Sequence, residues 1–156
     1  MKKHIWVVAL GIILSFVLLS SAYAGQINPS YNPKIIGRGG ELLNIGSFTE
    51  FSKSSSILAA LPYSENSGGK VQLTAFSNGK KISLSLTLYN SQVVSDSDDL
   101  IIAKADARGS WFNGKKNIRS LDLSVEYSCN RLSRTINLEG SGDLDFRIIN
   151  MDSNYC

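Results

Sequence analysis

The sequence is poor in the residues on which much enzyme chemistry depends. Its 156 residues include one histidine and two cysteines, and charged residues make up only 19%. Two cysteines are too few for a four-cysteine zinc site, and they exclude a small protein held together by many disulfides. The hydrophobic share of 43% is that of a globular chain, which excludes disordered, collagen-like and coiled-coil proteins. The length favours a single domain.

The first 24 residues have the three-part pattern of a secretory signal peptide. Lys2 and Lys3 give a basic start, an apolar run follows from Ile5 to Leu19, and Ala-Tyr-Ala at 22–24 provides a cleavage site before Gly25. The apolar run is short for a membrane-spanning helix, which needs about 20 residues. An uncleaved membrane anchor is the alternative. We expect an exported protein, periplasmic, cell-surface or secreted, with no membrane span after cleavage.

Cleavage leaves 132 residues and changes both charge and chemistry. Because Lys2 and Lys3 are lost, 14 basic residues remain against 13 acidic ones, and this near-neutral balance argues against a nucleic-acid partner. His4, the only histidine, also leaves. Ser-His-Asp and Cys-His catalysis and His-ligated zinc are therefore excluded. Carboxylate or lysine catalysis remains open, but we expect a non-enzymatic protein with no metal and no cofactor.

The two remaining cysteines, Cys129 and Cys156, are expected to form a disulfide. An exported chain meets an oxidising compartment, and the cysteine count is even. The bond would tie the C-terminus to the end of a strand, and free thiols are the alternative.

Alternation of apolar and polar residues dominates from residue 70 onward and predicts an antiparallel β-domain over 70–156. Two alternating runs flank Asn78-Gly79, which is a strong hairpin signal. The clearest strand is Ile118–Ser128. Gly109, Asn113-Gly114 and residues 140–142 are expected to mark turns. We predict a mainly β fold, as a single antiparallel sheet, a sandwich or a partly open barrel.

The segment 25–69 is expected to be irregular and to pack on this sheet. Residues 41–51 are compatible with one strand or two. Ser54 to Leu61 has the serines and the following Pro62 of a short helix, so at most one helix is expected.

Several motif matches fail on their context. Residues 109–115 have the spacing of a phosphate-binding loop, but Lys116 replaces the required Ser or Thr and a strand follows instead of a helix. The Ser-x-x-Lys matches at 67–70 and 77–80 lie across turns. The acidic group at 96–99 is interpreted as a solvated loop rather than a calcium site, and Asp143 and Asp145 as polar-face residues.

Aromatic and basic residues are concentrated in two short segments of the predicted β-domain. Such side chains on a rim favour binding to glycans, acidic protein surfaces or matrix polymers, although a solubilising rim is the simpler interpretation. The predicted contact residues are Trp111, Phe112, Lys115, Lys116, Arg119, Arg131 and Arg134. Arg134 is two residues from both Leu132 and Ile136, so in a regular strand it would lie on their apolar face and point inward, unless a bulge follows Cys129.

The segment from Tyr89 to Arg134 resembles the surface-adhesin protein E family of exported bacterial proteins. The resemblance is carried by Tyr-Asn-Ser at 89–91, the strand at 100–107, Ile-Arg-Ser at 118–120 and Glu-Tyr-Ser-Cys at 126–129. It implies an antiparallel sheet pinned by Cys129–Cys156 and, for some members, adhesion to host matrix proteins. It transfers no catalytic residue. The family's helix before its second cysteine has no counterpart here.

The leading hypothesis is an exported, non-enzymatic β-domain that binds a protein or glycan at the periplasm or cell surface, adhesin-like in type. One alternative is a periplasmic inhibitor or immunity protein that inserts the loop between Pro62 and Lys70 into a hydrolase or toxin. Another is a fimbrial structural subunit, which needs a donor extension; the alternation in 25–40 is poor for that role.

Overall fold

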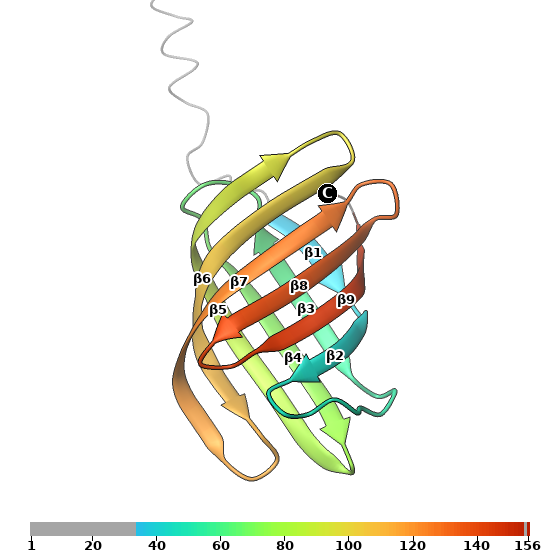
Figure 1. Cartoon of the computed structure of the whole chain (residues 1–156), viewed down its shortest axis with the longest axis vertical. Coiled ribbons are helices and arrows are strands. Elements are labelled where there is room, and N and C mark those ends of the chain that lie inside the picture. The colour runs from blue at the N-terminus through green and yellow to red at the C-terminus, as the bar shows by residue number, and fades with distance from the viewer. Residues whose placement is uncertain (1–33, 155) are drawn as a thin grey trace, which may run out of the picture. The chain divides into compact units, whose positions relative to one another are not determined.

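The computed structural model describes residues 34–154 and Cys156, and this part of the chain is built of β-strands with no helix (Figure 1). None of the described residues lies in a helix able to cross a membrane. The expected signal peptide at 1–24 lies outside the described residues. The strands are β1 (Lys34–Arg38), β2 (Glu41–Ile45), β3 (Ser56–Pro62), β4 (Gly69–Ser77), β5 (Lys80–Asp96), β6 (Leu100–Phe112), β7 (Asn117–Asn130), β8 (Thr135–Gly142) and β9 (Phe146–Ser153).

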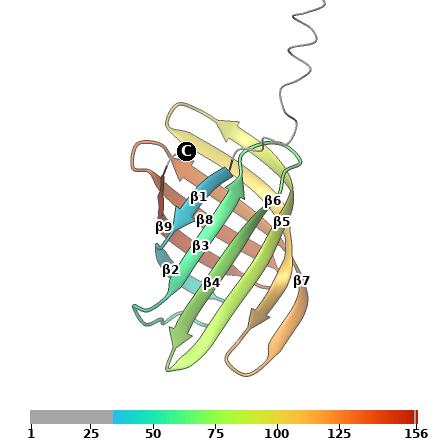
Figure 2. The ribbon, with the colours of Figure 1, turned by 180° about the vertical axis from the view of Figure 1, so that it is seen from behind.

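Eight of these strands close into an antiparallel barrel. Neighbours follow the order β1-β3-β4-β5-β6-β7-β8-β9, and β9 pairs back with β1 through Gly37–Ser153 and Arg38–Asp152. The extra strand, β2, follows β1 after two glycines and pairs with β9. Figure 2 shows the wall of the barrel formed by β3, β4 and β5. The expected mainly β, antiparallel fold is confirmed, and it takes the barrel form.

Alternate side chains of the strands point into the barrel and fill it. On β7 the inward row is buried, while Asp122, Ser124 and Glu126 on the opposite face are exposed. An eight-stranded barrel has an interior just wide enough for side chains to fill. The period-two pattern of the sequence therefore separates an apolar interior from a polar outer face. The inward row of β7 is Leu121, Leu123, Val125 and Tyr127.

The expected turn at Asn113-Gly114 is confirmed, but Gly109 and Gly140 lie inside strands β6 and β8 and do not mark turns. A Cβ at Gly109 would lie 1.9 Å from the carbonyl oxygen of Ser85, and one at Gly140 would lie 2.1 Å from Cε1 of Phe146. Glycine at these positions permits a close approach rather than a change of direction. The chain turns later, at 113–116 and after Gly142.

The segment expected to be irregular contains two strands of the barrel, β1 and β3, and the extra strand β2, and the possible helix at 54–61 is a strand. Ser56–Pro62 forms β3, which pairs with β1 on one side and β4 on the other. Ile57, Ala59 and Leu61 point inward and are buried. Serines and a following proline satisfy the local signals of a helix, but the alternation of these three residues fits a strand, and pairing on both edges satisfies its backbone.

Candidate binding surface at the hairpin end

The antiparallel strands place the turns at two opposite ends of the barrel. We call the end with turns at 78–79 and 113–116 the hairpin end, and the end with the turn at 131–134 and Cys156 the disulfide end. Both hairpins project at the lower end of the barrel in Figure 1, and the C-terminus lies at the upper end. Strand β7 connects the two ends with 14 residues, or about 45 Å of extended chain.

The predicted contact residues do not form one surface. Five of them lie at the hairpin end, whereas Arg131 and Arg134 lie beyond the other end of β7. The strand predicted over Ile118–Ser128 lies between the two groups, so the sequence already indicated that a strand's length separates them. The five residues at the hairpin end are Trp111, Phe112, Lys115, Lys116 and Arg119.

The two hairpin turns have a defined backbone geometry. Asn78 and Gly79 both have positive φ, 51° and 74°, as expected for a tight two-residue turn between paired strands. In the second turn, the side-chain oxygen of Asn113 accepts hydrogen bonds from the backbone N–H of Lys115 at 3.1 Å and of Lys116 at 2.8 Å. These two hydrogen bonds define the conformation of the second turn.

Four lysines meet where these turns adjoin. A Cβ built at Gly114 would lie 3.2 Å from Cβ of Lys80 and 3.7 Å from the carbonyl oxygen of Lys81, so the second turn packs on the first. All four lysine side chains are exposed. The ion pairs of the described residues involve arginines and none of these lysines. We call this group the lysine cluster, and it consists of Lys80, Lys81, Lys115 and Lys116.

Half of the lysine cluster was missed by the sequence analysis. Lys80 and Lys81 directly follow the Asn-Gly turn, so their position at a strand start was visible. Lys80 and Lys81 lie close to Lys115 and Lys116 because β5 pairs with β6, with Ser83 opposite Phe112. That register was not available from alternation alone.

Trp111 is a core residue rather than a surface contact. Its side chain is 8% exposed, and its ring meets that of Phe48 edge to face at a centroid distance of 6.3 Å. Alternate residues of β6 point inward, and Trp111 lies on the same face of the strand as the buried Ala105 and Ala107. That alternation was present in the sequence and predicts an inward side chain. Trp111 therefore closes the interior of the barrel beneath the hairpin end.

Phe112 and Arg119 are placed differently from Trp111. Phe112 is half-buried and has the opposite parity on β6; it lies opposite Ser83 on β5 and Asn117 on β7. Arg119 is exposed and precedes Ser120, whose φ is 62°, at an irregularity in the β6–β7 pairing. Both residues remain candidates for contact at the hairpin end.

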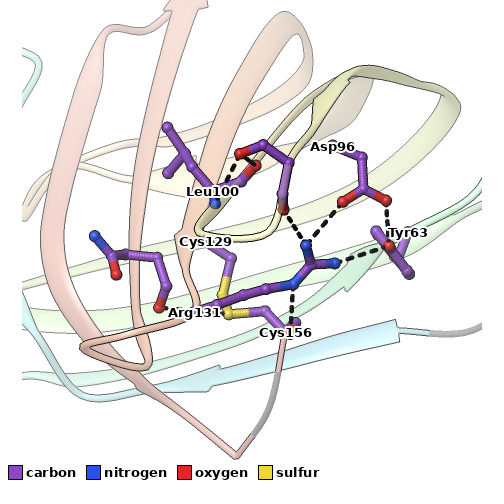
Figure 3. Close-up of polar contacts among 8 residues, drawn as sticks. Tyr63, Asp96, Leu100, Cys129, Arg131 and Cys156 are labelled. Carbon is purple, nitrogen blue, oxygen red and sulfur yellow. Dashed lines mark hydrogen bonds and ion pairs between the residues drawn. A yellow bond between two sulfur atoms is a disulfide. The ribbon is translucent and has the colours of Figure 1, made fainter.

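Arg131 organises the disulfide end (Figure 3). Its guanidinium forms an ion pair with Asp96 at 2.9 Å and donates hydrogen bonds to the hydroxyl of Tyr63 at 3.2 Å and the carbonyl oxygen of Cys156 at 3.1 Å. It also donates to the carbonyl oxygen of Ser97. One side chain thus joins the β3–β4 loop, the β5–β6 turn and the C-terminus, and its role here is structural.

The same cluster changes the acidity of two groups. The hydroxyl of Tyr63 donates to Asp96 at 2.6 Å. This hydrogen bond is the main reason that the pKa of Asp96 is lowered, with further lowering by Arg131. It is also the main reason that the pKa of Tyr63 is raised, because the phenol proton is held by the carboxylate.

The disulfide is confirmed. Cys129 and Cys156 are bonded, with their Cα atoms 6.0 Å apart. Among the described residues no helix precedes Cys156, because β9 continues to Ser153. Arg134 is exposed and lies in the turn with a φ of 54°, so the parity argument that pointed it inward is wrong. Its carbonyl oxygen accepts a hydrogen bond from the N–H of Ser153 at 2.9 Å.

The loop between β3 and β4 lies flat against the barrel. The hydroxyl of Ser91 donates to the carbonyl oxygen of Ser64 at 2.5 Å and accepts from the N–H of Ser67 at 2.8 Å. Glu65 accepts from the N–H of Val93 at 2.9 Å, and Ser67 is 4% exposed. This geometry does not favour insertion of the loop into an enzyme cleft.

The acidic residues singled out in the sequence have local roles. Asp143 accepts a hydrogen bond from the N–H of Asp122 at 2.9 Å, and Asp145 accepts one from the N–H of Gly142 at 3.4 Å, so both stabilise the β8–β9 turn. Asp96 belongs to the Arg131 cluster. Within residues 34–154 and Cys156, no three His, Cys, Asp or Glu side chains gather in a way that could hold a metal ion.

No protein-family model, curated protein or solved structure matches this chain. The resemblance to the surface-adhesin protein E family therefore stays a prediction from the sequence.

Proposed function

We propose that the protein is an exported, non-enzymatic β-barrel domain that binds an acidic macromolecule at the periplasm or cell surface, adhesin-like in type. The observation that carries the proposal is the lysine cluster on two adjoining turns with defined geometry. A fixed group of like charges attracts a partner of opposite charge and speeds its association. The signal-peptide pattern supports export, and the disulfide is consistent with an oxidising compartment.

A binding role is favoured over catalysis by the way the barrel is filled. Its interior is occupied by apolar side chains, so it offers no enclosed polar chamber for a substrate. The carboxylates of Asp143 and Asp145 accept backbone hydrogen bonds at the β8–β9 turn, and Asp96 forms an ion pair with Arg131. A fimbrial subunit that receives a donor strand needs a gap in its sheet. Here eight strands of the same chain close the barrel, so the structure does not support that alternative.

The proposal is tested with two variants that each lose four positive charges, one at the lysine cluster and one elsewhere on the surface. Binding of the purified 25–156 chain to immobilised bacterial-envelope and extracellular-matrix preparations is measured at low and high salt. A variant with all four residues of the lysine cluster changed to serine should bind roughly tenfold more weakly, and salt should weaken the native protein in the same way. The matched control has equal charge loss elsewhere, at Lys34, Arg38, Lys70 and Lys104, all of them exposed.

The control variant should keep binding within about twofold of the native protein. Equal weakening in both variants would mean that only net charge matters, and it would overturn the assignment of the lysine cluster. Unchanged binding in the cluster variant would overturn it as well.

A further inference from the structure

A depression on the outer face of the barrel lies next to the lysine cluster. It has a volume of about 320 Å³ and extends over β4, β5, β6 and the start of β7. We call it the outer groove. Its lining includes Lys81, Ser83, Ser85, Ser110, Phe112 and Asn117, with Gln72 and Thr74 on β4.

The strand register explains how the outer groove is formed. Thr74 on β4 lies opposite Ser83 on β5, Ser83 lies opposite Phe112 on β6, and Phe112 lies opposite Asn117 on β7. Side chains directly opposite each other in antiparallel strands have Cβ atoms about 5 Å apart. Short hydroxyl side chains therefore form the floor, with the ring of Phe112 and the amide of Asn117 at one side.

A second row repeats the pattern one step along the strands. Gln72 lies opposite Ser85, and Ser85 lies opposite Ser110. The groove thus offers several hydroxyls and two amides, which donate and accept hydrogen bonds. The only charged side chain that lines it is Lys81, and no carboxylate does.

This set of groups fits a sugar better than a peptide. Hydroxyl and amide side chains pair with sugar hydroxyls, while an aromatic ring offers a flat apolar surface for the C–H face of a sugar ring. An extended peptide instead needs a free strand edge, and β5 and β6, which run along the middle of the outer groove, are paired on both sides there. Lys81 and the three other residues of the lysine cluster add positive charge at one end of the groove.

We propose that the outer groove binds an acidic oligosaccharide, with a sugar ring on Phe112 and its negative group toward Lys81. This inference rests on the proposed function, because it names the class of acidic partner that the hairpin end binds. It predicts a preference for an acidic sugar chain over an acidic polypeptide of equal charge.

The test uses three probes: polygalacturonate, polyglutamate and uncharged dextran. The native 25–156 chain should bind polygalacturonate at least roughly tenfold more tightly than polyglutamate, a difference of about 1.4 kcal/mol, and should not bind dextran. Phe112→Ala and, independently, Ser85→Val should weaken binding to polygalacturonate by roughly tenfold and leave binding to polyglutamate unchanged. Tyr89→Ala, an aromatic change on β5 beyond the outer groove, is the matched control and should change neither. The fluorescence of Trp111 verifies that each variant is folded.

Each contrary result has a distinct meaning. Equal binding to the two polyanions, insensitive to Phe112→Ala and Ser85→Val, would overturn the sugar site and leave the lysine cluster as a general acidic-partner surface. Equal binding to dextran and polygalacturonate would overturn the requirement for charge. Failure to bind either polyanion would overturn the sugar site, while the envelope and matrix assay would still decide the proposed function.

Discussion

The phenol of Tyr127 on β7 donates a hydrogen bond of 2.5 Å to the carbonyl oxygen of Pro62, at the end of β3 and 65 residues earlier in the chain. Tyr127 is buried, and burial raises the pKa of its phenol. The bond crosses the interior of the barrel, because β3 and β7 are not neighbours in the sheet. It therefore links opposite walls of the barrel near the disulfide end.

Tyr127→Phe should lower the free energy of unfolding by about 1–3 kcal/mol, because the carbonyl of Pro62 loses a buried donor. Urea denaturation followed by circular dichroism measures the change. Tyr89→Phe is the control, since Tyr89 lies on the outer face beside Arg108, and it should leave the stability nearly unchanged. Equal effects of the two substitutions would show that the hydrogen bond contributes nothing specific.

Gly140→Ala should destabilise the barrel by about 1–3 kcal/mol through overpacking. The new Cβ would lie 2.1 Å from Cε1 of Phe146, so the ring or the strand must move. Ser141→Ala, at the next and outward-facing position, should change the stability by less than about 0.5 kcal/mol. Thermal melting of the two variants and the native protein measures the difference. A Gly140→Ala protein as stable as Ser141→Ala would contradict the close packing of Phe146 on Gly140.

Removing the disulfide should cost about 3–4 kcal/mol in the chain-entropy model, since the bond joins residues 27 apart. Cys129→Ala combined with Cys156→Ala avoids a free thiol. The native protein under reducing conditions should unfold at the same urea concentration as this double variant. A double variant as stable as the oxidised native protein would mean that the C-terminal tail is held by other contacts alone.

Asp96 should stabilise the protein at neutral pH and lose this effect in acid. The pKa of Asp96 is lowered in the folded protein by the hydrogen bond from Tyr63 and by Arg131. A carboxyl with a lowered folded pKa contributes stability above its unfolded pKa, about 3.9, and loses it as the pH falls through the folded value. Asp96→Asn should therefore be less stable than the native protein at pH 7, and the difference should shrink as the pH falls below about 4.

The control for that experiment is Asp98→Asn, which makes none of the Arg131 contacts and should show little difference at either pH. Urea midpoints at the two pH values provide the comparison. A gap between native protein and Asp96→Asn that persists unchanged in acid would show that the carboxylate charge is not what stabilises this end.

Trp111 should behave as a buried core residue in solution. It is the only tryptophan of the 25–156 chain, because the other tryptophan of the sequence is Trp6. Its fluorescence should lie to the blue of that of free tryptophan and resist quenching by acrylamide. Trp111→Ala should lower the free energy of unfolding by about 3–5 kcal/mol. A red-shifted, easily quenched fluorescence of the native protein would show instead that Trp111 is exposed.

The candidate site was only half visible in the sequence. Lys115, Lys116 and Phe112 were identified, because aromatic and basic residues are concentrated in this short segment of the sequence. Lys80 and Lys81 were missed because a cluster made by two hairpins depends on which strands are neighbours. Arg131 was wrongly grouped with the hairpin residues, although the strand predicted over Ile118–Ser128 separates it from them by the length of the barrel.

Alternation from residue 70 onward was enough to determine a β protein with one apolar face, since successive side chains of a strand point to opposite sides. The even cysteine count behind a signal-peptide pattern was enough to predict the Cys129–Cys156 bond. Closure of the barrel was decided only by the tertiary structure, because it depends on β1 pairing with both β3 and β9. The same long-range pairing turned Ser56–Pro62 into a strand and brought the four lysines together, and no local pattern encodes contacts between strands so far apart in the chain.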